Sequence, residues 1–542
     1  MAELKPPEQS PQLPSKPDRA QQAIIGLMVL LLAAPWLNPV ATGPTPNVIP
    51  WLVSIACASV YVLLRTIAPH AVARVPALAW VVAASASCLI GLLQYFGAAA
   101  AFSPLLNIAP AGEAFANLRQ RNQFATLTNL GLVALLSGLC FAQGRPGAGL
   151  QASRILAACS IAAAILLGAG NAASASRTGL LQLALVSALV FSYRWSDNTV
   201  IRRAWYASLV TYAIASVVLP HLAGLDPSAS GILTRLKDGA PACASRLTLW
   251  ANVLQLIGER PLTGWGWREL DYAHFMAVYP GERFCDILDN AHNLPLHLAV
   301  EFGVPVALML CGVGAWLIWR EQPWRETLCT RQLAWAGLAL ILLHSMLEYP
   351  LWYGPFQIAT GLCLWSLWTT RRRSTDQGRW PALATEGNCR NDPGLRVRVA
   401  ATGIASGMLL LATYAAWDYW RVSQIYLPPE RRAAAYMDNT LQKISDSWLF
   451  ADQVRFARLL TTELRPENAA EIHALAIGLL HFSPEARVVE KVMESAVMLG
   501  RDDEAIGYLI RYRLAFPKEH AVWSSANRAI APLGETSPPA SQ

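Results

Sequence analysis

Long apolar runs alternate with short polar connections over most of this chain. About eleven runs are long enough to cross a bilayer, because about 20 apolar residues in a helix span its hydrocarbon core. They lie near 23–42, 48–67, 76–97, 122–142, 155–173, 178–194, 203–223, 295–319, 332–350, 352–370 and 397–417. With 54% of the 542 residues hydrophobic and only 15% charged, the sequence predicts an all-α polytopic membrane protein rather than a soluble one.

The basic residues between the runs indicate how the helices are oriented. Arginines are dense in every second connection, at 65–74, 145–154, 194–203, 320–331 and 371–398. Such connections stay on the cytoplasmic side, so we expect the amino terminus inside and the remaining connections outside. A second group of arginines lies outside against this rule, and anion binding is the simplest reason: Arg119, Arg121, Arg177, Arg235, Arg246, Arg260, Arg268 and Arg283.

The same pattern divides the chain into five regions. Residues 1–20 are polar and rich in proline, which predicts a disordered cytoplasmic tail. Two groups of membrane helices are expected at 21–223 and 295–417, separated by a long outer loop at 224–294. The region 418–542 is expected to be helical and outside the membrane. Within it, residues 484–517 resemble one helix–turn–helix unit of tetratricopeptide length.

Ten cysteines are present, and most lie inside apolar runs, where a cysteine is usually a small core hydrophobe. Cys243 and Cys285 differ because both fall in the long outer loop. In an oxidising compartment we expect them to form a disulfide. The spacing of cysteines and histidines does not indicate a metal site, and we expect neither a metal nor a cofactor.

The segment around His292 combines a titratable side chain with the start of an apolar helix. Asn293 is a favourable N-cap, and Pro295 fits the first helical turn. His292 is therefore predicted to lie at the mouth of a membrane helix, beside the positive end of its dipole. A histidine that merely caps the helix is the alternative.

Two outer arginines extend this candidate site. Arg177 lies between the fifth and sixth runs, and Arg246 opens the segment Arg-Leu-Thr-Leu-Trp in the long loop. Two guanidinium groups can hold a diphosphate through paired hydrogen bonds, and a histidine can take a proton from an acceptor hydroxyl. Together with His292 they suit glycosyl transfer from a lipid diphosphate. For each arginine alone, contact with lipid headgroups is the alternative.

A second polar segment is predicted where the ninth run ends. Glu348 follows His344 by four residues, a spacing that places both side chains on one face of a helix. An ionisable pair next to the membrane is a functional candidate. A satisfied structural pair is the alternative.

Several of these segments resemble a known family. The superfamily of O-antigen ligases and Wzy polymerases has a similar signature and outer loop, which this chain matches with His292, Asn293, Leu296, Glu301, Gly303, 246–250 and 261–266. The narrower group of PglL-type bacterial protein O-oligosaccharyltransferases resembles the chain at 119–123, 344–353 and 423–430. The resemblance runs from about residue 23 to about residue 450.

The resemblance implies a GT-C-like enzyme of the bacterial inner membrane whose active site faces the periplasm. It would move an oligosaccharide en bloc from undecaprenyl diphosphate to a serine or threonine of a protein such as pilin, without metal, cofactor or nucleic acid. On this hypothesis His292 activates the acceptor, while Arg177 and Arg246 hold the diphosphate. The candidate substrate-binding residues are Gln123, Arg121, Asn293, Glu348, Tyr349 and His344.

Two alternatives remain open. One is a ligase that joins O-antigen to lipid A-core, or a Wzy-type polymerase. The segment 348–353 and the C-terminal region favour a protein acceptor instead. The other is a transporter of lipid-linked sugar, which should place charges near the bilayer midplane and show repeated halves. This sequence instead gathers its charge in one outer loop, and we see no repeat.

Overall fold

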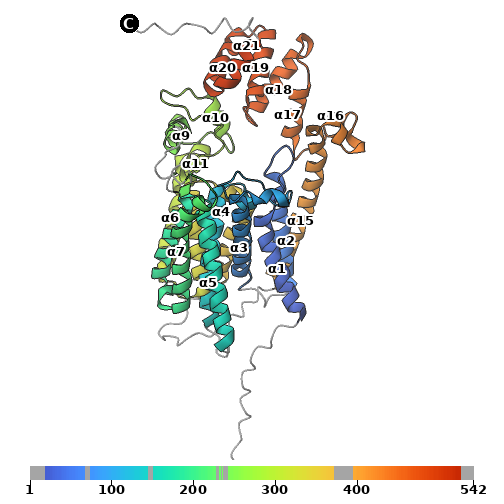
Figure 1. The fold of residues 1–542 in the computed structure, drawn as a ribbon. Helices are drawn as coiled ribbons and strands as arrows, with labels where there is room; N and C mark the ends of the chain where they lie inside the picture. Colours follow the sequence, from blue (N-terminus) through green and yellow to red (C-terminus); the bar gives the residue numbers. More distant parts are fainter. Residues whose placement is uncertain are drawn as a thin grey trace, which may run out of the picture.

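The fold is built from helices. The computed structural model describes residues 19–67, 74–143, 150–226, 231–232, 235, 242–370 and 395–526, and every regular element in these ranges is helical (Figure 1). The prediction of an all-α polytopic membrane protein is confirmed. Most of the predicted cytoplasmic tail and most of the basic segment 371–398 lie outside the described residues.

Within the described ranges, eight helices are long and apolar enough to cross a bilayer. They are α1 (Arg19–Leu37), α2 (Val48–Ile67), α3 (Val75–Tyr95), α4 (Arg121–Gln143), α5 (Leu150–Ala173), α7 (Thr199–Leu222), α12 (Val304–Glu321) and α15 (Leu395–Ser423). Shorter helices form at the other expected spans, namely α6 (Arg177–Ser192), which is apolar, α13 (Cys329–Ser345) and α14 (Gly354–Thr369). The count of eleven spans therefore stays a prediction.

The apolar run near 295–319 does not form the single helix that its hydropathy predicts. It forms two helices, α11 (Leu294–Phe302) and α12, which meet at Gly303. Gly303 has a φ of 86°, in the region that favours glycine, and a Cβ there would overlap the carbonyl oxygen of Leu262. His292 therefore precedes a helix of nine residues and not the start of a membrane span.

The outer loop is folded around two further helices, α9 (Arg246–Glu259) and α10 (Leu270–Met276). Ser245 caps α9, because its side chain accepts a hydrogen bond from the backbone N–H of Thr248 at 3.1 Å. This cap fixes the start of α9, so that Arg246 occupies its first turn.

The turn between α9 and α10 closes the end of α11. The N–H groups of Trp265 and Gly266 donate to the carbonyls of Val300 and Glu301 at 2.8 and 3.0 Å. These bonds satisfy carbonyl groups that a helix leaves unpaired at its C-terminus. Gly264 is required at this contact, because a Cβ there would overlap the backbone of Glu301.

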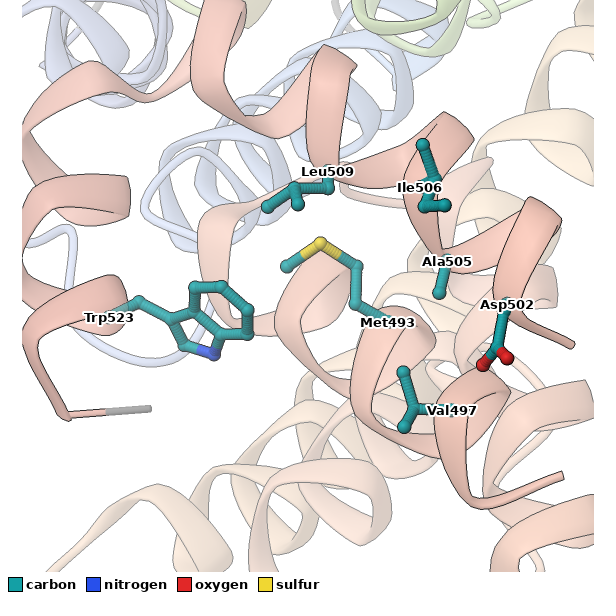
Figure 2. A pocket seen from close by; sticks show the side chains of 7 residues that line it. All are labelled: Met493, Val497, Asp502, Ala505, Ile506, Leu509 and Trp523. Carbon is teal, nitrogen blue, oxygen red and sulfur yellow. The ribbon is translucent and has the colours of Figure 1, made fainter. Parts of the chain in front are cut away.

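The C-terminal region is a separate helical layer that lies beyond α9–α11 at the same end of the bundle (Figure 1). Its helices are α16 (Thr440–Lys443), α17 (Ala451–Thr461), α18 (Ala469–Leu480), α19 (Ala486–Met498), α20 (Asp502–Ala515) and α21 (Pro517–Ala526). Figure 2 shows a mostly apolar groove that α19, α20 and α21 form, lined by Met493, Val497, Asp502, Ala505, Ile506, Leu509 and Trp523.

The structure pairs four cysteines. Cys243 and Cys285 lie together in the outer loop with their Cα atoms 5.2 Å apart. Cys140 and Cys329 also form a pair, between the end of α4 and the start of α13, although the sequence interpretation treated cysteines of apolar runs as core residues.

We predict that the Cys243–Cys285 pair is oxidised in the native protein. A bridge across 42 residues restricts the unfolded loop and adds about 3–4 kcal/mol of stability in the chain-entropy model. Mass spectrometry of an unreduced digest should show the crosslinked peptides. Two thiols that alkylate freely would contradict the prediction.

Candidate functional site

The carboxylate of Glu348 is the point at which the candidate residues meet. Its Oε2 lies 2.8 Å from Nδ1 of His292, and its Oε1 accepts a hydrogen bond from the guanidinium of Arg246. The side-chain amide of Asn122 donates to the same Oε1 at 2.9 Å. Glu348 lies in the bend between α13 and α14 with only 9% of its side chain exposed. One buried carboxylate therefore connects His292, a potential base, to Arg246, a potential phosphate-binding residue.

These partners determine the ionisation of Glu348. Burial by itself would raise the pKa of this carboxyl, but hydrogen bonds and charge from His292 and Arg246 lower it to about 2. The carboxylate is thus charged at neutral pH. The pKa of Glu348 is lower in the folded protein than its ordinary value of 4.5. The contacts of its carboxylate with His292 and Arg246 therefore stabilise the fold above pH 4.5, and this stability is lost as the pH falls toward 2.

The backbone holds His292 in an uncommon conformation. Its φ is 50°, in the left-handed region, and its N–H donates to Oδ1 of Asn290 at 2.9 Å. Asn293 caps α11 by accepting from the N–H of Leu296 at 3.1 Å, and its amide group donates to the carbonyl of Met346 at 3.1 Å. Both ends of the Asn293 side chain are therefore used to fix His292 between the loop and α13.

The imidazole of His292 is oriented on two sides. Nδ1 faces Glu348, and the ring packs edge-on against Tyr349 with 4.9 Å between ring centroids. A carboxylate at Nδ1 favours the tautomer with its proton there, which leaves Nε2 to accept a proton. The side chain is 26% exposed, so a substrate can reach it.

A hydrogen-bonded chain connects this carboxylate to the start of α6. Ser176 caps α6 by accepting from the N–H of Gly179 at 3.0 Å, and its hydroxyl donates to Oδ1 of Asn122 at 2.6 Å. Since Asn122 also holds Glu348, Arg177 at the first position of α6 is placed beside the network.

Further guanidinium groups gather at the same place. Arg235 donates to the carbonyl of Ala175 at 3.2 Å. Partial burial of its guanidinium, together with the nearby charges of Arg121, Arg177 and Arg246, lowers the pKa of Arg235. Arginines whose charges lie close together repel one another, and an anionic ligand would relieve that repulsion. The structure thus brings the predicted pair Arg177 and Arg246 together with Arg235.

Four of the predicted substrate-binding residues line one small cavity. Its walls come from Gln120, Gln123, His344, Glu348, Tyr349, Pro350 and Tyr353. His344 is fully buried with Nδ1 2.9 Å from the hydroxyl of Thr126, while its Nε2 has no hydrogen-bond partner among the described residues.

His344 and Glu348 keep the expected spacing, because the N–H of Glu348 donates to the carbonyl of His344 at 2.9 Å and both side chains line this cavity. The hydrogen bonds of the Glu348 carboxylate nevertheless go to His292, Arg246 and Asn122. Arg121 forms an ion pair with Glu113, and both side chains are partly exposed.

Asn122 is the main residue that the sequence interpretation missed. It lies inside the segment 119–123, but only the fold shows that its amide connects Glu348 to Ser176. A sequence signal existed, since Asn122, Thr126 and Asn129 recur at i, i+4 and i+7 in an otherwise apolar helix. This polar stripe marks the face of α4 that the site uses.

Fold and site together define a polytopic membrane protein with a cluster of histidine, carboxylate and arginine groups. The cluster lies at the end of the helix bundle where the outer loop is folded. The chain matches the O-Antigen ligase family at residues 162–311 and the family described as Virulence factor membrane-bound polymerase, C-terminal, at residues 332–531. It also matches the Protein glycosylation ligase family at residues 114–136. The residues of the cluster are distributed over all three matches.

Two curated relatives from Acinetobacter baylyi (strain ATCC 33305 / BD413 / ADP1) are similar to the chain. A ComP-specific O-oligosaccharyltransferase is 24% identical over 255 residues, which cover 46% of this chain and 43% of the relative. A General O-oligosaccharyltransferase is 26% identical over 152 residues, 26% of each chain. Each match thus spans less than half of the relative. No solved structure matches significantly. The predicted resemblance to PglL-type enzymes within the O-antigen ligase superfamily is confirmed.

Proposed function

We propose that the protein is a glycosyltransferase that moves an oligosaccharide from undecaprenyl diphosphate to a serine or threonine hydroxyl of a protein outside the cytoplasm, such as pilin. The observation that carries the proposal is the Glu348 carboxylate shared by His292 and Arg246. This geometry supports the proposal, because transfer from a diphosphate donor needs a base and a group that binds anions close together.

The chemistry follows from the positions of these groups. The acceptor oxygen attacks C1 of the first sugar while its proton passes to Nε2 of His292. The bond between C1 and the phosphate oxygen breaks, and undecaprenyl diphosphate leaves with the bonding electrons. Arg246 and Arg177 stabilise the charge on the departing diphosphate, and Glu348 stabilises the imidazolium. We assign no metal or cofactor to the reaction.

Arg246→Lys is predicted to impair transfer nearly as strongly as Arg246→Ala. A planar guanidinium can bind the Glu348 carboxylate and a phosphate oxygen at the same time, whereas an ammonium group acts as a point charge. Steady-state transfer rates of the two purified variants test this. If lysine restores most of the activity, Arg246 contributes charge alone.

The proposal requires the site to face the periplasmic side of the inner membrane, where lipid-linked glycans await transfer. We predict that single-cysteine variants carrying Gly281→Cys in the loop or Glu467→Cys in the C-terminal region react with an impermeant thiol reagent in intact spheroplasts. Asp197→Cys, in a basic connection on the opposite side, should react only after lysis. The reverse labelling pattern would show that the site faces the cytoplasm, and the proposed function would then be wrong.

A second candidate is the transfer of glycan to lipid A-core or to another glycan. The longer family matches, at 162–311 and 332–531, favour it. The match at 114–136 and the names of the two relatives favour a protein acceptor. Purified enzyme with undecaprenyl-diphosphate-linked oligosaccharide should be offered either pilin or lipid A-core. Intact mass of the products then decides, and glycan on lipid A-core alone would refute the protein acceptor.

A further inference from the structure

The short helix α10 belongs to two hydrophobic cores at once. On one side Leu270 and Ala273 are buried with Leu249 of α9 and Val300 of α11. On the other side Phe275 is 2% exposed and lies in the core of the C-terminal helices. α10 therefore connects the outer loop to the C-terminal region.

Polar and aromatic contacts reinforce the C-terminal side of this connection. Arg511 of α20 donates from Nε to the carbonyl of Met276 at 3.0 Å. His481 stacks on Tyr272 with ring centroids 3.8 Å apart, and its Nδ1 lies 2.7 Å from the carboxylate of Glu269 at the start of α10. α10 is thus held along its length by residues that come more than 200 positions later in the chain.

The loop side of α10 leads directly to the proposed base. Ala291, the residue before His292, is fully buried in the same core as Leu270 and Ala273. The indole N–H of Trp250 in α9 donates to the carbonyl of Ala291 at 3.1 Å. A shift of α10 would therefore disturb the packing that sets the backbone of His292.

A helix of seven residues has little stability of its own, because isolated helices shorter than about 12 residues are marginal in water. The position of α10 must therefore come from packing on both of its sides. Without the C-terminal contacts, Tyr272 and Phe275 would face water, and the loop core would lose one of its walls.

We infer that the C-terminal helical region is a positioning element of the active site. It holds α10 through Arg511, His481 and the core around Phe275, and α10 in turn fixes the segment that carries His292. This role rests on the function proposed above. It assigns to the C-terminal region an effect on the rate of the chemical step in addition to any contact with the acceptor.

The test compares Phe275→Ala and the milder Arg511→Met with wild type. Arg513→Met is the matched control, because Arg513 is an exposed arginine on the same helix. Hydrogen exchange of peptides covering residues 286–297 reports on the His292 segment without requiring activity. Rates of transfer to pilin give kcat and the KM for the acceptor.

We expect the segment 286–297 to exchange several-fold faster in both test variants, although neither residue touches it. The kcat should fall by up to about 10²-fold, as small displacements of reacting groups can cause, while the acceptor KM stays nearly unchanged. Arg511→Lys retains a donor for the Met276 carbonyl and should restore much of the rate. Arg513→Met should behave as wild type.

Two results would overturn the inference. One is faster exchange confined to residues 264–280 with normal exchange at 286–297. The other is an acceptor KM that rises while kcat is preserved, which would make the C-terminal region a docking surface only. If wild type shows no transfer but the exchange changes as expected, the proposed function fails while the connection from α20 to His292 stands.

Discussion

Replacing His292 by alanine is expected to slow oligosaccharide transfer by about 10²–10⁴-fold, the range typical for loss of a general base. The physical reason is the position of the ring, whose Nδ1 is held by Glu348 so that Nε2 can face the acceptor. The side chain is partly exposed, so its removal should cost little packing energy, and the variant should still fold and insert. The measurement is the rate of glycan transfer to pilin per mole of purified enzyme.

A matched control for this variant is His221→Ala. His221 lies in the last turn of α7 and is exposed, and it lies outside the network around Glu348. It should leave transfer unchanged. Near-normal transfer by a well-expressed His292→Ala variant would remove the base from the mechanism, although the arginines could still bind a diphosphate.

The membrane architecture could be predicted because hydropathy reports directly on residues that must avoid water. Each apolar run contains a helix in the structure, apart from the run near 295–319, which contains two. Averaging over a window hides such a break. Gly303 and the proline two positions later were visible in the sequence, but the break depends on the approach of the Leu262 carbonyl, which is a tertiary contact.

The sequence predicted the chemical types of the residues in the candidate site, but not which side chains contact one another. His292, Arg177 and Arg246 were chosen because their residue types suit a diphosphate donor. The structure pairs His292 and Arg246 with one carboxylate, and Arg177 follows Ser176, which is connected to that carboxylate through Asn122. The four-residue spacing of His344 and Glu348 does bring both side chains to one cavity, but the groups that bind the Glu348 carboxylate come from distant segments.

The contacts that complete the site join distant parts of the chain. Asn122 reaches Glu348 across 226 positions and Ser176 across 54 positions. The contact between Arg511 and Met276 spans 235 positions. Local patterns such as periodicity and capping carry no information on such pairs, so the role of Asn122 and the attachment of the C-terminal region to α10 required the fold.

Glu348→Gln is the second substitution from which we expect a large effect. The carboxylate accepts from His292, Arg246 and Asn122, whereas an amide would turn one of its own donors toward them. Arg246 would then lack its counter-charge. Leaving a buried charge unpaired costs about 3–5 kcal/mol, which is an upper limit here because Arg246 is 38% exposed. Transfer should slow by about 10²-fold or more, since His292 loses the group that sets its tautomer.

Glu113→Gln provides the comparison that separates a specific role of Glu348 from the general loss of an ion pair. Glu113 also pairs with an arginine, Arg121, but its side chain is 36% exposed and makes no contact with His292. Exposed pairs contribute at most about 1 kcal/mol, so this variant should keep its melting temperature and most of its activity. Thermal unfolding and transfer rates of both variants should be measured together. Equal losses in the two variants would show that Glu348 acts only as one member of a salt bridge, and the shared-carboxylate mechanism would then be wrong.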